Sequence, residues 1–141
     1  MPTHYEDEYT TTLNKIRYLI RQVRDVNKKL EIVSRGIQNL DNGYKVRNTK
    51  QVNQKLIEVN ELWQWITKQD SFTVLYSFGL SQHINNYMKF VPVIVETKNP
   101  MEKAKLIVKH LGILIDMMLE FTPELEKILL HSIERIEQSK A

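Results

Sequence analysis

The chain has 141 residues, of which 42% are hydrophobic and 26% are charged, with a net charge of +3. This is the length and balance of one globular domain, and it is too apolar for a chain kept disordered by its own charge. Only 4 Gly and 4 Pro are present, too few for collagen-like, linker-like or turn-dense all-β architectures. We therefore predict a single all-α domain over residues 1–141.

Several classes of protein are disfavoured by what the chain lacks. Without Cys, it has no disulfide bonds, thiolate zinc sites or cysteine nucleophiles. Its most apolar stretch, Leu111 to Leu119, is short and contains Asp116, whereas a membrane-spanning helix needs about 20 apolar residues. Residues 6–8 are acidic, where a secretory signal would be basic and then apolar. We expect a cytoplasmic protein with no membrane contact.

The strongest pattern begins at Ile16. Apolar residues recur from there at alternating spacings of three and four, which keeps them on one face of a helix. Asp41-Asn42-Gly43 supplies turn chemistry, so we predict that the helix ends near Leu40. Thr3 and Glu6 have the spacing of a capping box at its start, which gives roughly 35 residues, or about 50 Å. The stripe consists of Ile16, Leu19, Val23, Val26, Leu30, Val33, Ile37 and Leu40.

Capping residues and prolines divide the rest of the chain. A second helix is predicted from about Thr49 to Lys68, and a third follows the candidate caps Asp70 and Ser71. Gly79 interrupts the apolar face of this third helix, and we expect it to bend the helix.

Proline marks the remaining boundaries. Pro92 makes residues 93–95 the one place where the pattern allows a short extended piece. Asn99-Pro100 and Thr122-Pro123 each place a capping residue before a proline at the first helical position. These two motifs predict a fourth helix ending near Phe121 and a fifth helix after it. About five helices with short connections make a bundle with a long N-terminal helix.

Positive charge is concentrated in the first half of the chain. Residues 9–55 carry eleven Lys and Arg against three acids. Five of these bases recur at spacings of four, three, four and seven on one helical face, pointing away from the apolar stripe. We call them the basic row, and its members are Arg17, Arg21, Arg24, Lys28 and Arg35.

The basic row is rich in arginine, whose forked guanidinium suits phosphate contacts, and no acid interrupts its spacing. The segment after it adds Lys45, Arg47 and Lys50, which brings bases to the start of the second helix, where backbone donors also attract anions. These eight residues are our candidate nucleic-acid-binding residues. An ordinary hydrated helix face is the alternative interpretation.

No catalytic pattern competes with this interpretation. The four His residues show no i, i+4 pairing and no Glu-x-x-His arrangement, and the chain has no phosphate loop, nucleophile elbow or dinucleotide fingerprint. We therefore expect no enzyme, metal site or cofactor. Among the aromatic residues, Trp65, Phe78 and Phe90 fall off the main apolar stripes, so base stacking and a protein interface both stay open for them.

In residues 71–87, an apolar helix runs into Gly79-Leu80, followed by Gln82 and a further apolar segment that starts with Ile84. This order resembles a helix of the small helical subunits of type III CRISPR effector complexes. The resemblance covers about 17 of the 141 residues, and residues 125–138 lack the aromatic-rich ending of those proteins. It implies a non-catalytic subunit that stacks along guide and target RNA and contacts the backbone through basic residues.

We therefore predict a non-enzymatic helical subunit that binds nucleic-acid backbone, RNA in particular, within a larger RNA-guided antiviral defence complex. Its partners are nucleic acid and other protein subunits, including copies of itself. The alternative is a helical viral or phage structural or interaction protein, either a DNA-wrapping coat protein or a protein adaptor, without catalytic activity. The pattern leaves RNA versus DNA and the oligomeric state open.

Overall fold

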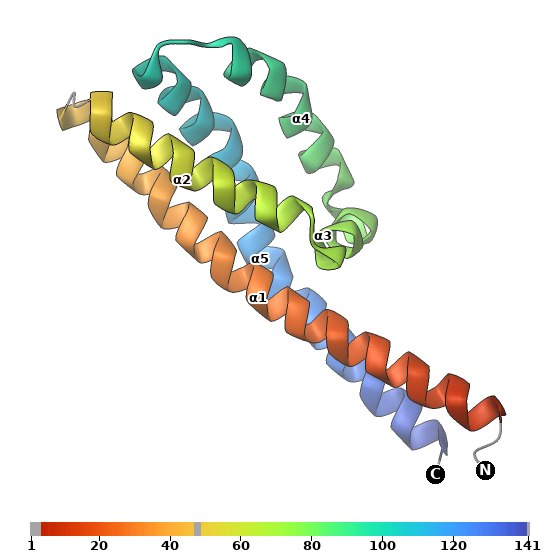
Figure 1. Ribbon diagram of the computed structural model, residues 1–141. Helices are drawn as coiled ribbons and strands as arrows, with labels where there is room; N and C mark the ends of the chain where they lie inside the picture. Colours follow the sequence, from red (N-terminus) through yellow and green to blue (C-terminus); the bar gives the residue numbers. More distant parts are fainter. Residues whose placement is uncertain (1–3, 47–48, 141) are drawn as a thin grey trace.

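Every regular element in the computed structural model is a helix (Figure 1), within the described residues 4–46 and 49–140. Side chains are described for residues 8–41 and 49–139. This confirms the all-α prediction. The elements are α1 (His4–Val46), α2 (Thr49–Thr67), α3 (Asp70–Leu75), the π-helical turn η1 (Tyr76–Leu80), α4 (Ser81–Glu96) and α5 (Pro100–Lys140).

The two longest helices, α1 and α5, run antiparallel and pack along each other, so that both ends of the chain lie together (Figure 1). Their register is shown by three contacts: Arg17 with Glu137, Asn27 with Thr122, and Ile37 beside Gly112. Near the chain ends, α1 and α5 form a two-helix stalk over residues 8–21 and 124–139. Towards the other end, α2 lies along α1 and α4 lies over α5, which makes a four-helix head (Figure 1).

The core follows the predicted apolar stripe of α1. Val26, Leu30, Val33 and Leu40 are fully buried, because in the head α1 is covered by both α2 and α5. Ile16 and Leu19 belong to the same stripe but are only half-buried, because in the stalk α1 has α5 as its main neighbour. The stripe therefore predicts the helix face correctly, and the number of neighbouring helices sets the degree of burial.

The helix that begins at Asp70 is capped from a distant part of the chain. We predicted Asp70 or Ser71 as the N-cap, but the N-cap residue is Gln69, and no side chain of its own helix caps it. Instead, the backbone N–H of Ser71 donates a hydrogen bond to Oε1 of Gln22 on α1, over 2.9 Å. A side chain of α1 thus satisfies an otherwise free donor at the start of α3.

Two predicted boundaries are absent because the helices continue through them. α1 runs through Asp41-Asn42-Gly43 to Val46, since one Gly inside a helix costs only about 1 kcal/mol. α4 runs through Pro92 to Glu96, so the extended piece allowed at residues 93–95 does not form. Pro92 removes one backbone donor, while Thr97 donates from both its N–H and its hydroxyl to the carbonyl of Val93 and holds the last turn.

The predicted break at Thr122-Pro123 is also wrong, because α5 is one helix of 41 residues. Thr122 does not cap a new helix, since its buried hydroxyl donates a hydrogen bond to Oδ1 of Asn27, over 2.5 Å. The predicted cap at Asn99 is confirmed: its Oδ1 accepts hydrogen bonds from the N–H groups of Met101 and Glu102, over 2.9 and 3.2 Å.

The expected bend at Gly79 is confirmed. Gly79 has φ 124°, and Phe78 before it is also outside the helical range, so the chain changes direction between α3 and α4. Glycine is needed at this position because L side chains rarely adopt such a φ. Because α3, η1 and α4 together form one broken helix, the described chain has four long helices rather than the five that the sequence predicts.

One prediction follows from the two glycines at the contacts of α1 with its neighbours. An Ala side chain at Gly36 would place Cβ 2.8 Å from Cγ2 of Val59 on α2, whereas at Gly112 it would lie 3.5 Å from Cγ2 of Ile37, an ordinary contact. Gly→Ala inside a helix gains roughly 0.5–1 kcal/mol, and overpacking costs about 1–3 kcal/mol. We expect Gly112→Ala to be more stable than the natural chain and Gly36→Ala to be less stable than Gly112→Ala by about 1–3 kcal/mol.

Urea unfolding followed by circular dichroism at 222 nm measures both free energies. Equal stability of the two variants would contradict the close approach of α1 and α2 at Gly36.

Candidate nucleic-acid interface

The basic row lies on the exposed side of α1, as the helical spacing predicts. All five of its side chains are exposed. Arg17, Arg21 and Arg24 lie in the stalk or at its junction with the head, and Lys28 and Arg35 continue the row along the head. At about 1.5 Å per residue, the row extends roughly 27 Å.

The stalk end of the basic row borders a groove between α1 and α5. The groove has a volume of about 590 Å³, and its lining includes Arg17, Arg21 and Arg24 from α1. The rest of the lining is apolar apart from Asn14: Ile20 comes from α1, and Leu130 and Ile133 come from α5. The structure thus combines three guanidinium groups with apolar surface in one concave site.

Two of these arginines already have carboxylate partners on α5. Nη2 of Arg17 lies 3.2 Å from Oε1 of Glu137, and Nε of Arg24 is paired with Oε1 of Glu126. The basic row itself contains no acid, as its spacing on α1 predicts, but α5 places two carboxylates beside it. The spacing of α1 alone does not reveal acids that lie 102 and 120 residues away in sequence.

The other three members of the basic row have no carboxylate partner among the side chains that the structure describes. These are Arg21, Lys28 and Arg35. They follow one another every seven residues, so their Cα atoms are about 10.5 Å apart along one face of α1. Glu31 also lies between Lys28 and Arg35 in sequence, and its Oε1 accepts a hydrogen bond from Asn27 over 3.4 Å.

The remaining candidate residues do not join this groove. Lys45 and Arg47 lie outside the residues whose side chains the structure describes. Lys50 is exposed in the first turn of α2, and α2 begins at the end of the head farthest from the stalk (Figure 1). The structure therefore separates Lys50 from the stalk groove.

The three aromatic residues outside the main stripes occupy different places. The ring of Trp65 has Nζ of Lys29 5.5 Å from its centroid, a cation–π contact. Phe90 stacks on His110 with ring centroids 3.8 Å apart. Phe78 is exposed beside Gly79. None of the three lines the stalk groove.

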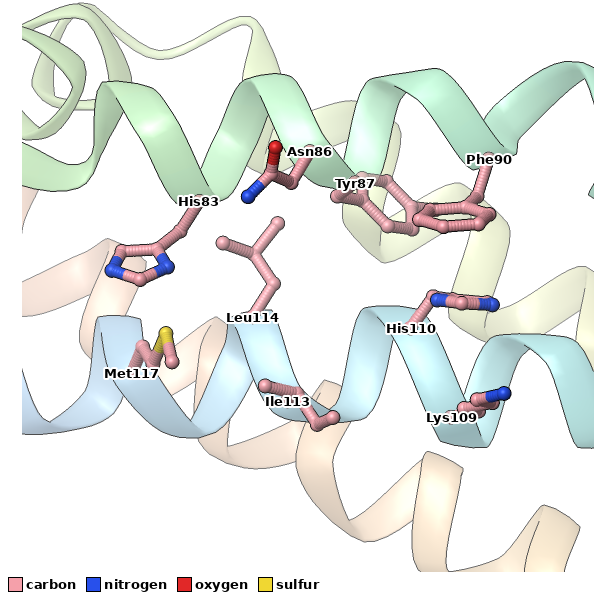
Figure 2. A pocket seen from close by; sticks show the side chains of 9 residues that line it. All are labelled: His83, Asn86, Tyr87, Phe90, Lys109, His110, Ile113, Leu114 and Met117. Atoms are coloured by element: carbon pink, nitrogen blue, oxygen red, sulfur yellow. The ribbon is translucent and has the colours of Figure 1, made fainter.

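A smaller pocket of about 160 Å³ lies between α4 and α5 (Figure 2). His83 and Met117 lie at one end of it, and the stacked rings of Phe90 and His110 lie at the other. Its nine lining residues include Lys109 but no carboxylate. No group of three or more His, Cys, Asp or Glu that could hold a metal ion occurs in the part of the chain that the structure describes.

The imidazole of His110 has an altered acidity. Its pKa is lowered from 6.5, first by burial against the α4 side of the pocket and second by the positive charge of Lys109. The folded protein therefore favours the neutral form of His110 more than the unfolded chain does.

Comparisons with known proteins give no family for this chain. No family model matches the sequence, no curated protein matches it, and no solved structure matches the fold. Within residues 4–46 and 49–140, no helix combines the length and the apolar character needed to cross a bilayer.

A pH dependence of stability follows from His110. Because its pKa is lower in the folded chain than in the unfolded chain, protonation favours the unfolded state. Stability from this group is present above the unfolded value of about 6.5 and is lost as the pH falls below it towards the lowered folded value. We expect the urea midpoint to fall between pH 7.5 and pH 5.5, and His110→Gln to remove that part of the fall.

Lys109→Gln is the companion variant. It should keep most of the pH dependence, because burial is the larger cause and the charge of Lys109 is the smaller one. An unchanged pH dependence in His110→Gln would contradict the assignment.

Proposed function

We propose that the chain is a non-enzymatic helical subunit that binds the phosphate backbone of nucleic acid, RNA in particular. The observation that supports this most is the line of three exposed cations without a carboxylate partner in the described structure, Arg21, Lys28 and Arg35. Together with the arginines of the stalk groove, they offer a polyanion five positive groups along one side of α1.

The ion pairs of Arg17 and Arg24 are compatible with this role. Both arginine side chains remain about half exposed, at 50% and 54%, and an exposed ion pair contributes only about 0–1 kcal/mol. A phosphate can therefore replace Glu137 or Glu126 at little cost. Arginine binds phosphate through two parallel hydrogen bonds as readily as it binds carboxylate. On this proposal the two glutamates compete with nucleic acid for the same guanidinium groups.

The apolar part of the stalk groove gives the backbone a second kind of contact. Ile20, Leu130 and Ile133 lie next to the guanidinium groups, where they can pack against sugars or base faces. Such contacts do not distinguish sequences, and phosphate contacts do not either. We therefore propose binding with little sequence preference, in which released counterions supply much of the free energy.

The proposal that the subunit acts inside an RNA-guided antiviral defence complex rests on the resemblance of residues 71–87. These residues form α3, η1 and the start of α4 around the Gly79 bend. They lie in the head, with α3 beside α1 (Figure 1), and none of them lines the stalk groove. In such a complex the head would contact neighbouring protein subunits while the basic row contacts the RNA.

A second candidate function is binding to an acidic protein segment, as in a viral structural protein or an adaptor. One observation favours it: Glu126 and Glu137 show that Arg24 and Arg17 accept carboxylates at this site. A complex that survives nuclease treatment, with no loss when RNA is degraded, would favour this candidate over the first.

The main test neutralises the three unpaired members of the basic row. For Arg21→Ala, Lys28→Ala and Arg35→Ala combined, we expect weaker binding of all single-stranded oligonucleotides, whatever their sequence. The slope of log K against log salt should become shallower by about 2, since each phosphate contact to a single strand contributes about 0.7. Fluorescence anisotropy with labelled RNA and DNA across a salt series measures both quantities.

The matched control removes three positive charges from elsewhere on the surface. Lys68, Lys89 and Lys98 are exposed and lie outside the basic row, so their combined change to Ala keeps the same net charge as the test variant. Equal losses in the two triple variants would show that net charge alone attracts nucleic acid, and unchanged binding in the test variant would reject the proposed interface.

A further prediction concerns the competing glutamates. In Glu126→Gln combined with Glu137→Gln, Arg24 and Arg17 lose their carboxylate partners, so nucleic-acid affinity should rise by about two- to fivefold for each pair removed. The salt slope should stay close to that of the natural chain, because Arg17 and Arg24 contact the same phosphates in both proteins.

The control for this variant is Glu102→Gln combined with Glu124→Gln. These carboxylates pair with Lys105 and Lys127 on α5 itself, so the net charge changes equally while the basic row is untouched. If the control raises affinity as much as the test variant, the competition between glutamate and phosphate is absent.

A further inference from the structure

A second groove lies in the head, between α2 and α4, with α5 beneath it. Its volume is about 470 Å³. Residues of α2 between Val59 and Thr67 border it on one side, and residues of α4 between Ile84 and Val95 border it on the other. Phe72 of α3, Tyr76 of η1, and Ile107 and Leu111 of α5 complete the lining. It is separate from the stalk groove, which is lined by other parts of α1 and α5.

The lining of this head groove carries no formal charge. None of its sixteen residues is Asp, Glu, Lys, Arg or His, and its polar side chains are amides, hydroxyls and an indole. A charged ligand group would therefore lose its hydration without gaining an ionic partner, which is unfavourable. The stalk groove, with three arginines, has the opposite character.

Three aromatic side chains form one rigid wall of the head groove. The ring of Trp63 meets Phe72 edge to face, with centroids 6.0 Å apart, and it meets Tyr87 edge to face, with centroids 5.6 Å apart. These contacts fix the three rings relative to one another. Trp63 belongs to α2 and Tyr87 to α4, so the contact between their rings also joins the two helices.

Two hydrogen-bond donors on this wall have no acceptor among the residues that the structure describes. Trp63 and Tyr87 are each only 8% exposed, and neither the indole N–H nor the phenol O–H donates to any residue in the described part of the structure. Burial raises the pKa of Tyr87 to about 12, so its hydroxyl keeps its proton at neutral pH. Both polar atoms are still open to the groove, since Oγ of Ser71 is the one fully buried side-chain N or O atom without a hydrogen-bond partner in the described part of the chain, so a ligand in the groove can reach them.

We propose that the head groove binds a neutral, mainly apolar small molecule that carries a hydrogen-bond acceptor such as a carbonyl oxygen. The volume falls within the range of about 300–1,000 Å³ typical of small-molecule sites. The uncharged lining selects a neutral ligand, the aromatic wall packs against its apolar body, and Trp63 and Tyr87 supply donors to its acceptor. This site is independent of the basic row and of nucleic-acid binding.

The test uses Nile red, a neutral apolar dye with a carbonyl acceptor, as the probe. The chain has two Trp residues, so Trp65→Phe leaves Trp63 as the only tryptophan reporter. In this background we expect saturable binding of one dye per chain, with a change in Trp63 fluorescence that follows the same binding curve as the dye emission.

Two substitutions in the same helix locate the dye. Val91 lines the head groove, whereas Val93 is on the same helix, half exposed and outside the lining. Val91→Phe fills the groove and should weaken binding at least tenfold, while Val93→Phe should leave it within twofold. Tyr87→Phe removes one donor and should weaken binding about fivefold, the effect of one neutral hydrogen bond of about 1 kcal/mol. Circular dichroism checks that each variant retains its helices.

Three outcomes would overturn the proposal. The first is no saturable dye binding to the Trp65→Phe protein. The second is equal weakening by Val91→Phe and Val93→Phe. The third is a dimer, seen by light scattering, that only Val91→Phe converts to monomer while the dye fails to bind; a second copy of the chain would then occupy the groove. Full affinity in Tyr87→Phe would likewise contradict the role of the phenol as donor.

Discussion

The antiparallel packing of α1 against α5 is the contact on which the rest of the structure depends. It buries the apolar stripe of α1 against side chains such as Ile115 and Met118 of α5, and it sets the register through the hydrogen bond between Thr122 and Asn27. This register decides which acidic side chains of α5 lie beside the basic row. A shift of one helical turn, about 5.4 Å, would move the pairing groups of α5 to different partners on α1.

The same packing lowers the positive potential along the basic row. An arginine that has a carboxylate beside it presents less positive potential to its surroundings than a lone arginine does. A single phosphate gains little by replacing one exposed glutamate, because the two ion pairs are similar in strength. In the proposed function a polyanion would also contact Arg21, Lys28 and Arg35 and gain several contacts from one binding event, which favours long ligands over single anions.

Local patterns predict the helices well and the contacts between them poorly. The spacing of the α1 stripe identifies its buried face, because helical periodicity depends only on neighbouring residues. Asn99-Pro100 and Thr122-Pro123 are nearly the same motif, yet only the first begins a helix. The difference is tertiary, since the Thr122 hydroxyl bonds to Asn27, 95 residues away. The carboxylate partners of Arg17 and Arg24 cannot be predicted from the sequence for the same reason, because helical periodicity does not determine the register between two helices.

The head groove is lined partly by residues that helical periodicity assigns to the core, and the bend at Gly79 places them there. Trp63 and Tyr87 lie on apolar stripes and are buried, as their spacing predicts. Unlike residues enclosed in the core, they also line a groove, and their rings meet each other edge to face. The backbone at Gly79, with its positive φ, sets the direction of α4 relative to α3. An unbroken helix would point residues 81–96 elsewhere, and the aromatic wall would not form.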